Sequence, residues 1–255
     1  MPLILISNDD GYQARGVQIL ARLLSQLGKV VAVCPDGPQS GKSMAITVNQ
    51  PLRVRRLDNR GDGVEWYAVN GTPADCIKLA MHTILRDHRP DMVCTGINHG
   101  SNAAVNVLYS GTMGAAFEGC AFGIPSVGFS LDDHSADADF TPMLPYVEKI
   151  ARTVLENGLP KGVCLNVNAP ATPEIKGARL TVACNGYWSD EYAEHIDDEG
   201  KPYYWLTGDF INSEPDNPDT DDAWMKKGYI SIVPCATDRT TDAAIPLEIF
   251  NDLES

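Results

Sequence analysis

The sequence has no C-x-x-C pair, no apolar run of membrane length and no excess of basic residues. Its seven cysteines stand far apart, mostly among Val, Leu and Ala, as reduced cysteines in a core do, so we expect no disulfide framework. The N-terminus shows no basic region followed by a long apolar stretch, and we expect neither a signal peptide nor a membrane span. A cytoplasmic location is the resulting expectation.

The shortage of basic residues also limits the partners. The 255 residues include 20 Lys and Arg against 34 Asp and Glu, a formal net charge of −14 at pH 7. Binding to duplex nucleic acid needs a basic surface and is therefore not expected. A small anionic substrate remains compatible, because a bound cation can reverse the local field. The length fits one large α/β domain, alone or with an appendage.

A short apolar run near the N-terminus ends in two adjacent carboxylates. Residues 3–6 (LILI) are followed by Ser7-Asn8-Asp9-Asp10-Gly11, and an amphipathic helix is predicted from about residue 16. This pattern predicts a buried parallel strand, and ligands bind beyond the carboxyl ends of such strands. Asp9 and Asp10 would suit a hard divalent cation such as Mg²⁺ or Mn²⁺. A solvated turn is the alternative, since Asn, Asp and Gly are common turn residues.

A Gly/Pro/Ser loop follows the second predicted strand, residues 30–34. Only three residues separate Gly37 from Gly41, whereas a P-loop has four between its glycines, so we reject that motif. The loop is retained as a wall of the site, because Ser40 offers a hydroxyl oxygen and Gly41 allows a ligand to come close.

Polar residues also follow the strand predicted at 92–95. Asn98 offers an amide oxygen to a cation, and His99 is a candidate for acid–base chemistry, with a surface or hydrogen-bonded histidine as the alternative. Further on, Ser110 and Thr112 precede a Gly- and Ala-rich helical segment, residues 113–122. Their hydroxyls indicate either an anion site at a helix N-terminus or simple capping.

The remaining elements support an α/β fold with a mainly parallel sheet. We predict a hairpin over residues 52–69, a helix from Pro73 with Thr72 and Asp75 as its capping box, a helix over 143–156 and a strand over 163–168. Residues 177–235 differ, because they hold aromatic, hairpin-like strands without strand–helix alternation. We expect this β extension to pack against, or swap with, a second subunit.

Several stretches, in order along almost the whole chain, resemble one family, that of the stationary-phase survival protein SurE, a metal-dependent nucleoside monophosphate phosphatase. They are SNDDG (7–11), the Ser40-Gly41 loop, NGTPADC (70–76), GIN (96–98), YSGT (109–112), LNVN (165–168), DTD (219–221) and GYIS (228–231). The resemblance implies a Rossmann-like three-layer core over residues 1–176, a C-terminal β extension over 177–235 exchanged in a homodimer or homotetramer, and a tail, 236–255, packing on the core or the partner.

The same resemblance implies site residues and a cofactor. One divalent metal per subunit, Mg²⁺ or Mn²⁺, would be held by Asp9, Asp10, Ser40 and Asn98, with Asp9, Asp10 and Asn98 as the catalytic residues. Asn8 would support that shell, and the residues around the phosphate would be Asn8, Gly41, Asn102, Ser110, Gly111 and Thr112.

The function predicted on this basis is hydrolysis of nucleoside 5′-monophosphates, and potentially of the 3′ isomers, to nucleoside and phosphate. Two alternatives stay open. A haloacid-dehalogenase-like phosphatase needs D-x-D-G-[TV], whereas this chain reads Asn8-Asp9-Asp10-Gly11-Tyr12. A metal-dependent nucleotide sensor without turnover would use the same site residues.

Overall fold

The computed structural model describes residues 1–57, 63–238 and 240 of the chain. The turn of the hairpin predicted over 52–69 and most of the tail at 236–255 therefore lie outside the described residues. Among the helices that are described, none combines the length and the apolar character needed to cross a bilayer.

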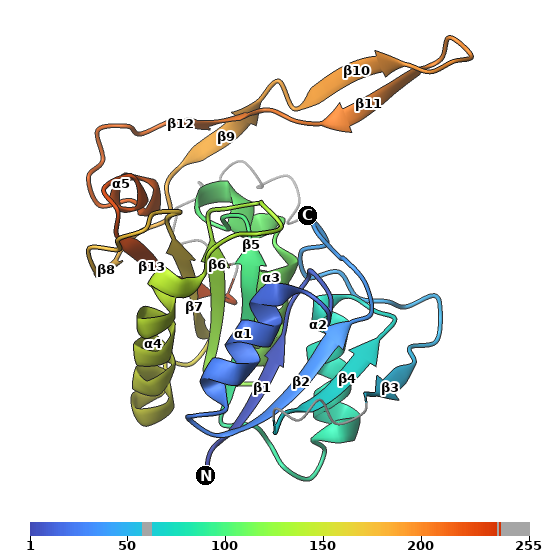
Figure 1. Cartoon of the computed structure of the whole chain (residues 1–255), viewed down its shortest axis with the longest axis vertical. Helices are drawn as coiled ribbons and strands as arrows, with labels where there is room; N and C mark the ends of the chain where they lie inside the picture. The colour runs from blue at the N-terminus through green and yellow to red at the C-terminus, as the bar shows by residue number, and fades with distance from the viewer. Residues whose placement is uncertain (58–62, 239, 241–255) are drawn as a thin grey trace, which may run out of the picture.

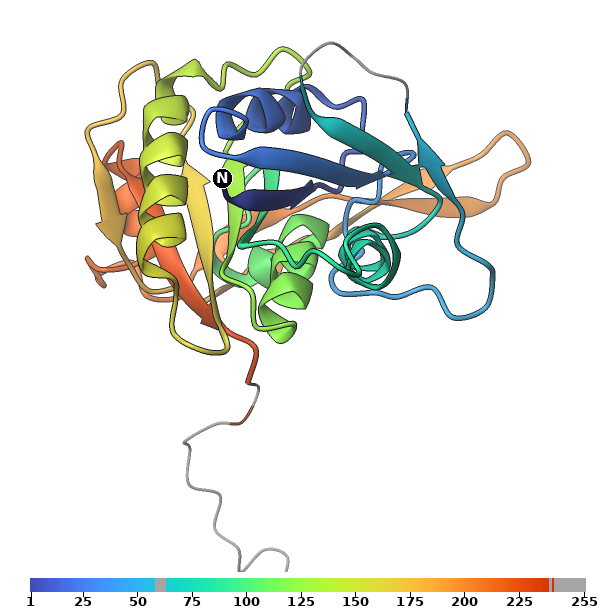
Figure 2. The same ribbon diagram turned by 90° about the horizontal axis from the view of Figure 1, so that it is seen from below.

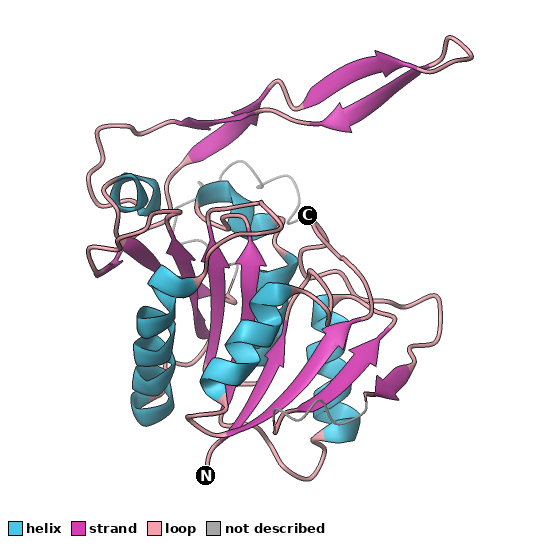
Figure 3. Cartoon of the chain, in the orientation of Figure 1, coloured by secondary structure: helices cyan, strands magenta, loops and turns pink. Residues whose placement is uncertain are grey.

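The chain forms one nine-stranded sheet in the order β3-β4-β2-β1-β5-β6-β7-β13-β8, with helices on both faces (Figures 1 and 3). The strands of this sheet are β1 (Leu3–Ser7), β2 (Lys29–Pro35), β3 (Val54–Arg56), β4 (Glu65–Val69), β5 (Met92–His99), β6 (Ser126–Leu131), β7 (Val163–Ala169), β8 (Ala178–Leu180) and β13 (Ile230–Ala236). The helices are α1 (Arg15–Leu24), α2 (Pro73–Leu79), α3 (Gly111–Ala121), α4 (Leu144–Asn157) and α5 (Asp221–Lys226), with short turns η1 (Ala80–Ile84), η2 (Ala104–Leu108) and η3 (Thr141–Met143).

The six strands from β4 to β7 in this order run parallel, which confirms the predicted α/β class. Their near-continuous apolar sequences arise because both faces of the sheet are covered. One face packs against α1 and α4, and the other packs against α2 and α3 (Figure 2). The expected hairpin is confirmed in its strands, since β3 pairs antiparallel with β4.

The N-terminus of α2 forms as its sequence predicts. The Thr72 hydroxyl accepts the backbone N–H of Asp75 at 3.1 Å, and Asp75 Oδ2 accepts the backbone N–H of Thr72 at 2.9 Å. This capping box satisfies two N–H groups that the helix itself leaves without partners. Asp75 also accepts the Thr47 hydroxyl at 2.6 Å, so it ties the loop that follows β2 to α2.

Of the interval 177–235, only the strands β9 to β12 leave the central sheet (Figure 1). We call residues 186–212 the arm; it contains β9 (Gly186–Ser189), β10 (Tyr192–Ile196), β11 (Pro202–Leu206) and β12 (Asp209–Asn212), paired as β9 with β12 and β10 with β11. At the edge of the central sheet, β13 runs antiparallel to β7, and β8 adds parallel to Ile230–Ile232 of β13.

The interval also contains a helix that the sequence analysis did not predict. Helix α5 begins after Thr220, whose hydroxyl accepts the backbone N–H of Ala223, and Asp221 and Asp222 stand in its first turn. Acidic residues are favourable there because they face the positive end of the helix dipole. Six residues give too short a stretch for helical periodicity to be visible in the sequence.

A close approach between α1 and β5 gives a first testable prediction. A Cβ placed on Gly16 would lie 1.9 Å from the carbonyl oxygen of Ile97, so Gly16→Ala forces backbone apart. We expect a loss of about 2 kcal/mol in the free energy of unfolding, measured by urea denaturation. The control is Gly37→Ala, because its added Cβ would have nothing within 4 Å. Equal stability of the two variants would contradict the tight contact.

Candidate active site

The predicted site lies where the direction of sheet winding changes. From β1 the chain crosses through α1 to β2 on one side, and after β4 it returns through α2 to β5 on the other side of β1. The carboxyl ends of β1 and β5 therefore flank a crevice, which is the usual ligand position in open α/β sheets. Asp9 and Asp10 follow β1, and Asn98 lies at the end of β5.

Asp9 is almost entirely removed from solvent, with 4% of its surface exposed. Its Oδ1 accepts the Thr112 hydroxyl at 2.6 Å. Burial raises the pKa of Asp9 to about 6; the Thr112 hydrogen bond opposes this shift, and the negative charge of Asp10 adds to it. Asp9 is thus a carboxylate whose ionised form lacks sufficient compensation from the protein.

Asp10, the second carboxylate, lies close to the end of β5. The His99 backbone N–H lies 3.4 Å from Asp10 Oδ2. Burial raises the pKa of Asp10, while this N–H and the charges of His99 and His134 lower it. In the His99 ring, Nδ1 lies 3.0 Å from the Ser135 carbonyl oxygen, and the ring packs edge-on against Phe140.

The loop after β2 comes within reach of the same carboxylates. The Gln39 backbone N–H donates to the backbone oxygen of Asp9 at 2.6 Å, which brings the neighbouring Ser40 close to Asp9. Further along, the Ser43 N–H donates to the Tyr109 carbonyl at 3.0 Å, just before α3. The loop therefore spans from β1 to α3, with Ser40 and Gly41 exposed at its middle.

The N-terminus of α3 points at Asp9. A Cβ on Gly111 would lie 2.8 Å from Asp9 Cβ, so the glycine is what lets the helix come so near. The Ser110 hydroxyl accepts the Met113 N–H at 3.0 Å, as an N-cap does. The Thr112 backbone N–H, like its hydroxyl, favours the ionised form of Asp9, whereas the Gly111 N–H makes no hydrogen bond within the described residues; together with the helix dipole these groups favour an anion.

Asn102 is held by residues whose role the sequence did not reveal. Its N–H donates to Asn168 Oδ1 and its carbonyl accepts Asn166 Nδ2, both at 2.8 Å. Its own Nδ2 donates to the Ser130 hydroxyl at 2.8 Å. The available signal was two asparagines spaced by two in a strand, because this spacing puts both amides on one face.

The donor set fits a divalent cation. No three His, Cys, Asp or Glu side chains converge on one point within residues 1–57 and 63–238, so a cation at Asp9 and Asp10 needs neutral oxygens as well. Asn98 can supply one, since its Nδ2 is occupied by the Gly100 carbonyl at 2.8 Å and its Oδ1 remains. Asn8 Oδ1 is buried without a hydrogen-bond partner. A hard cation suits these oxygens and would offset the buried charge.

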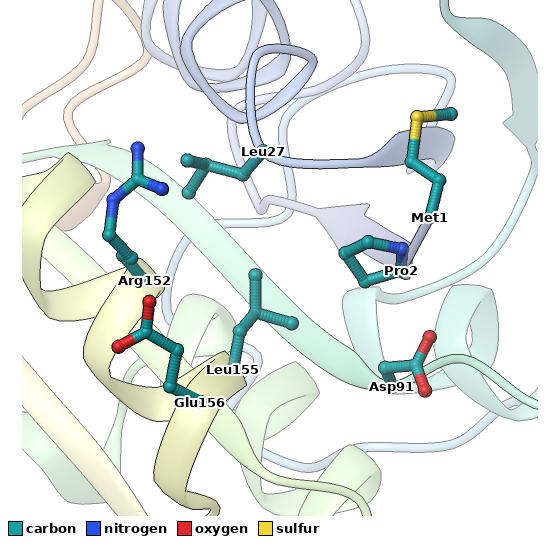
Figure 4. Close-up of a pocket in the computed structure, with 7 residues that line it drawn as sticks. All are labelled: Met1, Pro2, Leu27, Asp91, Arg152, Leu155 and Glu156. Carbon is teal, nitrogen blue, oxygen red and sulfur yellow. The ribbon is translucent and has the colours of Figure 1, made fainter.

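A separate hollow lies at the opposite end of the sheet (Figure 4). Met1 and Pro2 before β1, Asp91 before β5, and Arg152 and Leu155 of α4 line it. Because these residues stand at the amino ends of the strands, the hollow contains none of the site residues, and we assign no chemistry to it.

The structure is that of a Rossmann-like α/β protein with buried carboxylate and amide oxygens beside a helix N-terminus at the switch point of a parallel sheet. A family model described as Survival protein SurE matches residues 4–190. The chain belongs to the SurE family.

Relatives and a solved structure agree with this assignment. A protein of Bacteroides fragilis named 5′-nucleotidase SurE is 49% identical over 239 residues, which cover 94% of this chain and 93% of the relative. One of the same name from Phocaeicola vulgatus is 48% identical, covering 94% and 92%. The crystal structure of the SurE protein from Aquifex aeolicus superposes with a TM-score of 0.84 at 35% identity, over 100% of both chains.

The raised pKa of Asp9 predicts how its charge affects stability. The folded protein holds this proton more tightly than the unfolded chain, so stability falls as pH rises from about 4 to about 6, by about 3 kcal/mol in total. In EDTA at pH 7.5, Asp9→Asn should therefore raise the free energy of unfolding by up to that amount. The gain should vanish below pH 4.

Urea denaturation at both pH values checks this expectation, with exposed Asp87→Asn as the control. Adding Mg²⁺ should stabilise the wild type and leave Asp9→Asn nearly unchanged. If Asp9→Asn is less stable than the wild type at pH 7.5, and Mg²⁺ raises the free energy of unfolding of both proteins equally, then Asp9 does not bind the cation.

Proposed function

We propose that this protein is a metal-dependent nucleotidase, a phosphoric monoester hydrolase that releases phosphate from nucleoside 5′-monophosphates and, as a second class, from the 3′ isomers. The observation that carries the proposal is the contact between buried Asp9 and the N-terminus of α3, because a cation held by Asp9 would then lie beside an anion bound at this helix end. Relatives that share almost the full length of the chain bear the name 5′-nucleotidase SurE, which supports the same reaction.

In this proposal Asp9, Asp10, Ser40 and Asn98 hold one Mg²⁺ or Mn²⁺ per subunit, and Asp9, Asp10 and Asn98 are the catalytic residues. The cation would polarise a phosphoryl oxygen and offset its charge. Asp10 has the more exposed carboxylate of the pair, so it is the one suited to orient an attacking water. Thr112 keeps Asp9 in place through its hydroxyl.

The phosphoryl group would lie at the N-terminus of α3. The Gly111 N–H and the Ser110 hydroxyl would bind the phosphoryl oxygens, next to Thr112, which donates to Asp9. Asn102, in the segment after β5, and Gly41, in the loop after β2, would complete the binding site of the phosphoryl group. Asn8 would support the residues that hold the cation. Because these groups are fixed before the substrate arrives, little reorganisation accompanies the reaction.

Phosphate release tests this function directly. A panel of 5′- and 3′-mononucleotides is incubated with Mg²⁺, Mn²⁺ or EDTA, and we expect release that EDTA abolishes. Asp9→Asn and Asp10→Asn should each lower kcat at least about 100-fold, the scale of losing a group that stabilises the transition state, while Asp87→Asn stays active. Tight nucleotide binding without any release would favour the sensor instead.

We further propose that the arm joins two or four copies of the chain. Its apolar side chains lie open to solvent in the single chain, with 65% of Trp205 and 72% of Leu206 exposed. Isolated two-stranded hairpins are marginal in water and exposed apolar patches mark interfaces, so a second copy is a suitable cover. In this reading residues 1–176 form the catalytic core together with β8 and β13, and the arm within 177–235 serves oligomerisation.

The net charge and the cysteines indicate which ligands and which cellular compartment suit the protein. A formal net charge of −14 favours small ligands over duplex nucleic acid and gives no basic attraction to a membrane surface. The seven cysteines are thiols and form no disulfides, and six of them are buried, which suits a reducing compartment such as the cytoplasm.

Shortening the arm tests the oligomer. Gly186 and Asn212 are register partners in β9 and β12, so an Asn-Gly turn can replace residues 187–211 without stretching the chain. We expect a monomer by light scattering, because the exposed apolar strands are gone while β8 and β13 remain. A shortened protein with the wild-type oligomeric mass would place the interface elsewhere.

A further inference from the structure

The segment between β5 and α3 carries two of the proposed phosphate ligands. Asn102 stands near its start and Ser110 at its end, with η2 between them. Their separation therefore depends on how η2 is held, since the segment itself belongs to no strand and to no long helix.

Asn106, in the middle of η2, makes hydrogen bonds toward both ends of this segment. Its carbonyl oxygen accepts the N–H groups of Tyr109 at 3.0 Å and Ser110 at 3.1 Å. On the other side its Nδ2 lies 3.5 Å from the Ser101 carbonyl. One residue thus links the neighbour of Asn102 to Ser110.

The remaining amide oxygen of Asn106 is bound from the arm. Trp188 in β9 donates its indole N–H to Asn106 Oδ1 at 2.8 Å, across 82 positions of sequence. The Trp188 ring is half-buried and packs edge-on against Phe210 of β12, with ring centroids 6.2 Å apart. Its position is therefore set by the pairing of the two arm strands.

A second bond from the interval beyond β7 supports the same turn. Asp221, fully buried at the start of α5, accepts the Ala104 N–H at 2.8 Å and the Cys184 N–H at 2.9 Å. Ala104 adopts a φ of 52°, which is unfavourable for a residue with a Cβ, so this hydrogen bond stabilises a strained position. The start of η2 is thus fixed without Trp188. Trp188 stabilises only the middle and the end of η2.

We propose that Trp188 is a positioning residue for the phosphate site, acting through Asn106 on Ser110 and Asn102. The proposal rests on the proposed function, because it assigns Trp188 an effect on the binding of that phosphate. Without the indole N–H, the Asn106 side chain loses its anchor to the arm. The middle of η2 is then held less firmly, and so is the Asn106 carbonyl that accepts the Ser110 N–H. Chemistry at Asp9 is unaffected, since α3 keeps its contact with β1.

Trp188→Phe tests this, because it keeps the aromatic ring against Phe210 and removes only the donor. We expect KM for the mononucleotide to rise about fivefold, as the loss of one hydrogen bond typically gives, with kcat within twofold. The Kd of inorganic phosphate, measured by calorimetry with Mg²⁺ present, should rise by the same factor. A role limited to stability would lower Tm and leave both constants unchanged, which would overturn the proposal.

Trp224→Phe is the matched control. Trp224, in α5, is also half-buried, but its ring packs against Tyr229, and none of the hydrogen bonds described for η2 involves its side chain. This variant should keep the wild-type KM and phosphate affinity. Light scattering on both variants confirms an unchanged oligomer, so that a displaced arm is not mistaken for a local effect.

A double-mutant cycle shows whether Trp188 acts through Asn106. In an Asn106→Leu background, Trp188→Phe should have no further effect on phosphate Kd; in Asn106→Asp, which keeps an oxygen acceptor, the effect should persist. Additive effects with Asn106→Leu would contradict the pathway. Wild-type protein that binds phosphate but hydrolyses no nucleotide would refute the proposed function, whereas an active wild type with an indifferent Trp188→Phe would refute only this inference.

Discussion

The arrangement of the site depends on one constraint, the burial of the Asp9 carboxylate directly beside Asp10. A carboxylate in such a position is costly unless donors and positive charge surround it. Within the described residues, none of the ion pairs involves either aspartate. What the protein supplies is the Thr112 hydroxyl and the N-terminus of α3, brought close by a glycine at position 111. The protein therefore compensates the charge only in part, and a cation is a natural complement.

The sequence predicted those parts of the site that depend on local order. A buried strand ending in Asp9, an amide after β5 and hydroxyls before α3 all fall at the carboxyl edge of a parallel sheet, so they could be assigned to one place before the structure. The capping box of α2 was predicted for the same reason, because its two partners are three residues apart. Short-range rules suffice for such features.

The remaining features join distant segments and carry no periodic signal. The amides of Asn166 and Asn168 reach Asn102, more than 60 positions away, and nothing in the sequence of β7 names that partner. The same holds for Trp188 and Asn106. From sequence alone, strands β8 and β13 look like parts of an extension, because their place in the main sheet follows from the pairing of β13 with β7 and of β8 with β13, not from their composition.

The incomplete pairing of β13 has a consequence for solubility. Strand β8 pairs only with Ile230–Ile232 of β13, so within the described residues the strand ladder on that side ends there. The Thr181 N–H donates to the Ile232 carbonyl, which shows that even-numbered residues of β13 direct their backbone groups to that side. Pro234 has no N–H to offer there, and a foreign strand cannot continue the ladder past it. Pro234 thus opposes edge-to-edge aggregation at a part of the sheet where a strand of another molecule could otherwise pair.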